Sequence, residues 1–286
     1  MIDYLLKRII ARNFQIQAES HTTMNLRMAT LLVMAALSGC AGLPGAQTHT
    51  VDQRSVEWVA RPGRMPAVVF ENGLGGRMEW WGKVLPALPP DTAYFAYNRP
   101  GYGNSSAAST ARDGAHVVDE LRAALAAQQL RPPYVLVGHS LGGLYMQLFA
   151  RQYPDEVAAL VLVDSTHPKQ LEGAGALENQ PLWVRGVVGI AVTGAAKEEL
   201  ALLPRTGEQV LNLPTLNGKP VYVLTAAEPM KETSDLARFA NEKRIDIARL
   251  YPGSHQIWVD SGHGIPLEKP QAVVEAILNA LGDVQR

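Results

Sequence analysis

A short stretch near the middle of the chain has the residues and spacing to present a nucleophile. Residues 138–142 read Gly-His-Ser-Leu-Gly, which fits the pattern G-x-S-x-G. In this pattern a serine occupies a tight, strained turn between a strand and a helix, and the glycines leave room for the close approach of the chain. An apolar run at 134–137 precedes the motif, and a helical pattern at 141–153 follows it. This context predicts a nucleophile elbow centred on Ser140.

A serine hydroxyl is a weak nucleophile at neutral pH and needs a base within hydrogen-bond reach. His263 is the predicted base, because it follows the expected strand 256–259 in a loop that contains glycine. We expect the side chain of His139 to point away from the attack direction of the serine. His167 lies at the start of a long insertion, and the remaining histidines are expected on the surface, at a strand edge or outside the fold.

The acid that orients the base is less narrowly defined by the residues alone. It must reach the second ring nitrogen of the histidine. Asp164 ends the strand after the elbow, and Glu228 follows the next strand; Asp235 is a third and less favoured option. Asp260 lies too near His263 in the chain to fold back onto it.

Strand-like apolar runs alternate with helical patterns from residue 56 onward. This alternation predicts an α/β fold whose mostly parallel sheet is flanked by helices on both faces, with ligands bound at the carboxyl ends of the strands. About fifty residues separate the strand that ends near Asp164 from the strand that begins near Val221. We interpret residues 168–218 of this interval as a helical cap over the site. The expected strands are 67–70, 93–97, 134–137, 159–163, 221–224 and 256–259, and the expected helices are 113–129, 141–153, 195–203 and 271–281.

Four ordered blocks resemble the α/β-hydrolase superfamily, in the group of esterases, lipases and proline iminopeptidase-like enzymes. The resemblance covers roughly residues 67–281 and includes the elbow, residues 97–105 with Asn98 in place of the usual aspartate, residues 162–168 and residues 261–263. It implies a serine hydrolase that needs no cofactor and cleaves carboxylic esters through an acyl-enzyme. It favours Asp164 as the acid over Glu228. The alternatives are an amidase or peptidase, a C–C hydrolase, a lipase acting at a membrane, or a non-catalytic protein that binds a small ligand.

Acyl transfer also needs two N–H donors for the developing oxyanion. The backbone of Leu141, directly after the nucleophile, is one predicted donor, and Leu74 in the loop 71–76 is the other. The family often has His-Gly where this chain has Asn72-Gly73, so we expect the loop to lack a side chain that braces it. This glycine-rich loop lacks the Lys-Ser/Thr end of a phosphate-binding loop, and no spacing of ligands predicts a metal site.

The first forty residues resemble a secretory leader rather than part of the fold. A basic stretch at 24–27 precedes the apolar run 28–37, and Leu-Ser-Gly-Cys at 37–40 resembles a bacterial lipobox. Cys40, the single cysteine of the 286 residues, is therefore the predicted lipidation site; a plain cleaved signal or a packed cysteine is the alternative. Ala41 then favours the outer membrane, and residues 41–55 are expected to form a tether. Residues 1–23 are either untranslated or an amphipathic extension. The net charge of −1 does not favour nucleic-acid binding.

Overall fold

The computed structural model describes residues 42–180, 182, 185–186, 189, 192–227 and 235–286. Residues 1–40, which include Cys40 and the expected leader, and the alternative acid Glu228 therefore lie outside the described residues. Within the described residues, no helix is both long enough and apolar enough to cross a membrane.

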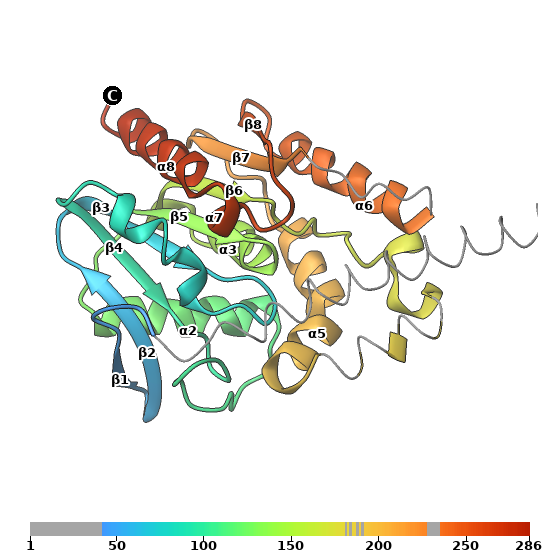
Figure 1. The fold of residues 1–286 in the computed structure, drawn as a ribbon, viewed down its shortest axis with the longest axis horizontal. Coiled ribbons are helices and arrows are strands. Elements are labelled where there is room, and N and C mark those ends of the chain that lie inside the picture. Colours follow the sequence, from blue (N-terminus) through green and yellow to red (C-terminus); the bar gives the residue numbers. More distant parts are fainter. Residues whose placement is uncertain (1–41, 181, 183–184, 187–188, 190–191, 228–234) are drawn as a thin grey trace, which may run out of the picture.

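Eight strands form one twisted sheet in the order β1-β2-β4-β3-β5-β6-β7-β8 (Figure 1). The first two strands pair antiparallel, β2 pairs antiparallel with β4, and every later pairing is parallel. The predicted α/β-hydrolase fold with a mostly parallel sheet is thus confirmed. The strands are β1 (Gln47–Val51), β2 (Arg54–Arg61), β3 (Arg64–Glu71), β4 (Thr92–Tyr97), β5 (Tyr134–His139), β6 (Val157–Val163), β7 (Val221–Ala226) and β8 (His255–Val259).

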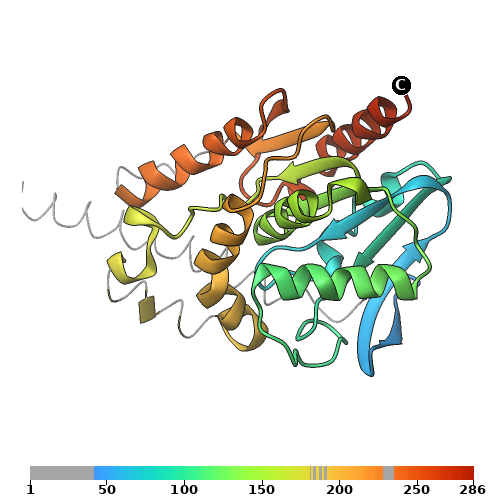
Figure 2. The same ribbon diagram turned by 180° about the vertical axis from the view of Figure 1, so that it is seen from behind.

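Helices cover both faces of the sheet, and each face has its own apolar core (Figures 1 and 2). On one face, α2 (Gly114–Ala127) and α3 (Leu141–Gln152) pack on the sheet through residues such as Leu121 and Leu144. On the other, α8 (Pro270–Val284) buries Val273 and Ile277 against the sheet. The central strands β5 and β6 are buried throughout because both their faces are covered, which explains their continuous apolar sequences.

The segment between β6 and β7 carries the longest insertion. Its main described element is α5 (Gly194–Leu211), which contacts α3 and α2. Between β7 and β8 lie α6 (Asp235–Asp246) and a 3-10 turn (Ile247–Leu250), and α7 (Ile265–Glu268) follows β8. Figure 2 shows α5 beside α3.

The sheet begins earlier in the chain than we expected. Residues 41–55 were predicted to be a tether, but Gln47–Val51 form β1 and pair with β2. Val51 is buried, and the ring of His49 stacks on Trp58 of β2 with 4.0 Å between ring centroids. The sequence of β1 is polar except for Val51, so it lacks the apolar pattern of a covered strand and is easily mistaken for a linker.

Candidate active site

Ser140 lies in a strained turn between β5 and α3. Its backbone has φ 53° and ψ −123°, a region that residues with a side chain seldom adopt. The turn is possible because neighbouring glycines allow backbone to pack on backbone. A Cβ at Gly138 would lie 2.6 Å from the carbonyl oxygen of Gly142, and one at Gly142 would lie 2.4 Å from that of Glu71. The elbow expected from the sequence is therefore present.

Ser140, His263 and Asp164 form one hydrogen-bonded chain at the carboxyl edge of the sheet. The Oγ of Ser140 lies 3.0 Å from Nε2 of His263, and Nδ1 of His263 lies 2.6 Å from Oδ2 of Asp164. An ionised carboxylate only accepts, so Nδ1 carries the proton and Nε2 keeps its lone pair for the serine hydroxyl. This is the arrangement that a serine nucleophile and its base require.

Asp164 lies in a pocket of donors that keeps it ionised. Its side chain is 1% exposed, and it accepts from Nη2 of Arg244 at 3.0 Å and from the backbone N–H of Ala226 at 3.1 Å, besides His263. Burial alone raises the pKa of this carboxyl, but the hydrogen bond and charge of His263, with Arg244, outweigh it and hold the pKa of Asp164 well below its usual range. A charged Asp164 can therefore stabilise an imidazolium at His263.

Of the other two candidate acids, only Asp235 lies within the described residues, and it does not take this place. Asp235 begins α6, where its exposed carboxylate pairs with Arg238 one turn later. Glu228 lies outside the described residues, so its position is not compared. Sequence reasoning missed Arg244, because it lies 80 residues from Asp164 in the chain and belongs to no motif.

His139 has a closer relation to the base than we expected from its place in the elbow. Its Nε2 lies 2.9 Å from the carbonyl oxygen of His263, and the two rings are 4.8 Å apart. The ring of His139 also stacks on that of Trp80, with 5.1 Å between the ring centroids. Burial, and the proximity of His263, lower the pKa of His139 to about 3. A neutral His139 thus supports the loop that carries the base.

The predicted oxyanion donors lie where the elbow meets the loop after β3. No hydrogen bond among the described residues uses the backbone N–H of Leu74 or Leu141. The α-carbon of Gly73 lies against the nucleophile, since a Cβ there would be 3.1 Å from Cβ of Ser140. The loop that carries Leu74 therefore packs directly against the nucleophilic turn.

The departure from His-Gly at Asn72-Gly73 does not leave the loop without a brace. Asn72 is buried, and its Nδ2 donates to the carbonyl oxygen of Tyr97 at 2.8 Å. Asn98, in place of the family's aspartate, donates to Glu57 at 2.7 Å and accepts from the N–H of Met78 at 2.8 Å. Our expectation of a missing brace was wrong, because the amide of Asn72 spans the gap to β4.

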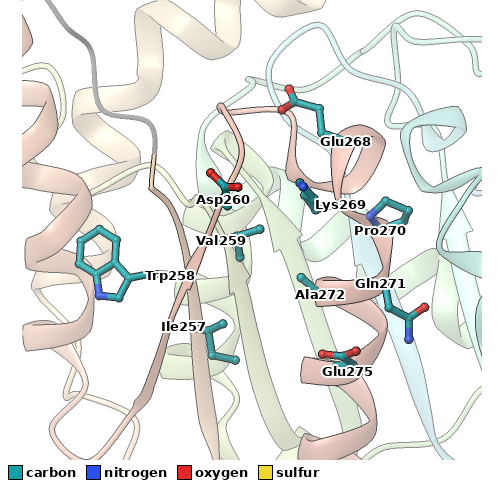
Figure 3. Close-up of a pocket in the computed structure, with 10 residues that line it drawn as sticks. All are labelled: Ile257, Trp258, Val259, Asp260, Glu268, Lys269, Pro270, Gln271, Ala272 and Glu275. Carbon is teal, nitrogen blue, oxygen red and sulfur yellow. The ribbon is translucent and has the colours of Figure 1, made fainter.

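A separate hollow of about 440 Å³ lies between β8 and the start of α8 (Figure 3). Figure 3 shows Asp260 and Glu268 at its upper end, whereas Trp258 points away from α8. None of the lining residues belongs to the Ser140–His263–Asp164 chain. Glu268 does accept from the N–H of Gly262 at 3.0 Å, so one wall of the hollow supports the loop of His263. Within the described parts of the chain, no group of three or more His, Cys, Asp or Glu side chains is placed to hold a metal ion.

Comparison with known proteins agrees with this geometry. Residues 66–263 match the family described as alpha/beta hydrolase fold. An uncharacterized protein of Schizosaccharomyces pombe is 38% identical over 104 residues, which are 36% of this chain and 19% of that protein. The human (Lyso)-N-acylphosphatidylethanolamine lipase is 28% identical over 127 residues, 43% of this chain and 37% of the lipase. The matched stretches are thus well under half the length of these relatives.

Solved structures share the architecture over most of the chain. A thermophilic esterase from Thermogutta terrifontis superposes with a TM-score of 0.61 at 20% identity, over 84% of this chain and 99% of the esterase. This likeness concerns the fold, while the family match extends from near the start of β3 through the elbow to His263. The chain therefore belongs to the α/β-hydrolase fold family.

Proposed function

We propose that the protein is a serine hydrolase that cleaves carboxylic esters through an acyl-enzyme on Ser140. The observation that carries this proposal is the continuous chain of 3.0 Å and 2.6 Å contacts from Ser140 through His263 to Asp164. The names of a similar lipase and of a structurally similar esterase support an ester as the scissile bond. Small to medium acyl groups are the expected substrates.

In this proposal Oγ of Ser140 adds to the ester carbonyl carbon while its proton passes to Nε2 of His263. The charge that develops on the carbonyl oxygen is stabilised by the N–H groups of Leu74 and Leu141. The imidazolium is stabilised by Asp164 and returns its proton to the leaving alcohol as the C–O bond breaks. Water, deprotonated by the same imidazole, then attacks the acyl-enzyme and releases the acid. The scheme requires no cofactor.

We assign the insertion at 168–218 the role of a cap that shapes the substrate pocket. Its helix α5 packs against α3, the helix that begins at the nucleophile. Val192, just before α5, and Ala196, in the first turn of α5, form a small apolar cluster with Tyr102. A cap at this position would exclude water from the acyl group and restrict its size.

The proposal is tested by replacing Ser140 with alanine. We expect Ser140→Ala to lose p-nitrophenyl butyrate turnover by at least about 10⁴-fold and to lose fluorophosphonate labelling, because no other group supplies the nucleophile. An unchanged circular dichroism spectrum serves as the control for folding. A wild-type protein that reacts with fluorophosphonate but turns over no ester would instead favour an amidase or a C–C hydrolase, and one that does neither would favour a binding protein.

The same assay assigns the acid. We expect Asp164→Ala to lower kcat by about 10⁴-fold, the loss typical when the histidine is no longer held in the required tautomer. Glu228→Ala is the matched control and is expected to stay within about threefold of wild type. The reverse result would transfer the role to Glu228.

A further inference from the structure

Arg99 is a fully buried cation that lies between the loop 71–76 (the oxyanion loop) and α5 (the cap helix). It lies in the turn after β4, and its side chain is 1% exposed. Nη1 donates to Oε1 of Glu71 and to the carbonyl oxygen of Asn72, both at 2.6 Å. Nη2 donates to the carbonyl oxygen of Gly73 at 3.0 Å. One guanidinium thus holds three consecutive residues at the start of the loop.

The bond to Gly73 determines where the Leu74 amide points. A trans peptide is planar, so its C=O and the following N–H point in opposite directions. The Gly73 oxygen is held by Arg99 at 3.0 Å and by the N–H of Gly76 at 3.1 Å. With its oxygen held on that side, the Gly73–Leu74 peptide directs its N–H away from Arg99. A Cβ at Gly73 would lie 3.1 Å from Cβ of Ser140, so this peptide borders the site.

The other side of the guanidinium is bound by the insertion. Glu199 of α5 has no exposed side-chain surface and binds Arg99 with two parallel hydrogen bonds, Nε to Oε1 at 2.9 Å and Nη2 to Oε2 at 3.0 Å. The hydroxyl of Tyr102 donates to the same carboxylate at 2.6 Å. A buried ion of this kind is retained only when its partners stay in place, because an unpaired charge in the interior is costly. The orientation of Arg99 therefore depends on α5.

We infer that Arg99 is a positioning residue that aims the Leu74 N–H at the oxyanion, and that Glu199 makes this aim depend on the docked cap helix. The inference rests on the proposed acyl-transfer function. It adds a link by which the insertion acts on transition-state stabilisation and not on substrate binding alone.

The test compares two lysine variants at two buried arginines. Arg99→Lys keeps the charge but has a single nitrogen, which cannot reach Glu71, both loop carbonyls and Glu199 together. Arg151→Lys is the matched control: Arg151 of α3 is also buried, and its Nη1 donates to the carbonyl oxygens of Val210 at 3.2 Å and Leu213 at 3.4 Å. Within the described structure it has no hydrogen bond or ion pair with the loop 71–76 or with Glu199.

We expect Arg99→Lys to lower kcat for p-nitrophenyl butyrate by about 10–100-fold with KM within threefold, since loss of one oxyanion donor costs about 10²–10³ in kcat. Arg151→Lys is expected to stay within threefold of wild type. The affinity for a trifluoromethyl ketone, whose adduct with Ser140 places an oxyanion in the same site, should fall in parallel with kcat. Equal losses in the two variants, or a lower kcat with unchanged inhibitor affinity, would overturn the inference.

Glu199→Gln provides a second test of the inference if the arginine variants do not fold. The amide retains one acceptor for Arg99 and removes a charge, so we expect a smaller fall in kcat, about 3–10-fold, again matched by the inhibitor. Unchanged kcat in folded Glu199→Gln would overturn the dependence on the cap helix. A wild-type protein without ester turnover or inhibitor binding would refute the proposed function itself, whereas an active wild type with an equally active Arg99→Lys refutes only the inference.

Discussion

At the scale of single residues, two buried groups beside His263 keep opposite charge states. Asp164 stays ionised because its hydrogen bonds to His263 and Arg244 favour the carboxylate. His139 stays neutral because burial and the nearby base disfavour a second cation. The base is therefore held between one fixed negative charge at its ring and one neutral donor at its backbone. This arrangement favours a single proton acceptor, Nε2 of His263.

The neutral His139 makes the stability of the fold depend on pH. Its pKa of about 3 lies below the ordinary value of 6.5, so the unfolded chain binds a proton that the folded protein does not. The contribution of the neutral His139 to the free energy of unfolding is therefore complete above about pH 6.5. It falls as the pH drops toward 3, by at most about 1.4 kcal/mol per pH unit. His139→Gln cannot titrate. We expect the stability advantage of wild type over this variant to shrink by about 2 kcal/mol between pH 7 and pH 4.5, as measured by urea unfolding.

The comparison of wild type with His139→Gln isolates the contribution of His139 to the pH dependence, because the two proteins share all other titrating groups. An advantage that stays constant across this pH range would mean that His139 is protonated in the folded protein or is solvated.

Local motifs predicted the nucleophile and the base, but not the residues that hold them. Ser140 could be identified because the elbow needs glycine at defined positions, and His263 because a strand end delivers it. Arg244 and Glu199 act over separations of 80 and 100 residues from their partners, Asp164 and Arg99. Such pairings depend on how α5 and α6 pack, which no local pattern encodes.

At the scale of elements, the site depends on how closely α3 approaches the end of β3. Gly142 in the first turn of α3 faces the backbone of Glu71 and Asn72, and a Cβ there would lie 2.4 Å and 2.5 Å from their carbonyl oxygens. Backbone atoms cannot give way as a flexible side chain can. We expect Gly142→Ala to push α3 from the oxyanion loop, with a cost of about 1–3 kcal/mol in unfolding free energy and at least a tenfold loss of kcat.

A glycine on another helix separates this steric effect from helix propensity. Gly282 lies in α8 with nothing near its missing Cβ. Gly282→Ala is expected to stabilise the protein by about 0.5–1 kcal/mol and to leave kcat unchanged. If Gly142→Ala behaved in the same way, the close approach of α3 to β3 would not be required for the site.

The sequence predicted the covered central strands better than the edge of the sheet. Buried parallel strands such as β5 and β6 are continuous apolar runs, and their helices show clear periodicity. The first strand, β1, is polar along most of its length because one side of it faces water, and its residues 47–51 were assigned to a tether. The sheet thus starts within the segment that was expected to link an anchor to the domain.

At the scale of the whole molecule, buried charges join the insertion to the body of the hydrolase domain. Arg99 and Arg112 of the connection from β4 to α2, Glu71 at the end of β3 and Glu199 of α5 come from three separate segments, and all four are shielded from water. Loosening of the insertion would expose or unpair these charges, which is unfavourable. The cap helix and the oxyanion loop are therefore expected to move together and not independently.

Residues 24–40 predict where in the cell the whole molecule is located. Cys40 follows Leu-Ser-Gly after an apolar run, the pattern that resembles a lipobox, and it lies outside the described residues. We expect the protein, expressed in a Gram-negative host, to incorporate radiolabelled palmitate and to sediment with outer membranes. Cys40→Ser should abolish both, while the ester turnover of the released protein stays within about twofold, because the Ser140–His263–Asp164 chain lies wholly within the folded domain. Ala41→Asp should retain the label but shift the protein to the inner membrane. Palmitate incorporation that persists in Cys40→Ser would show that the lipid is attached to another residue.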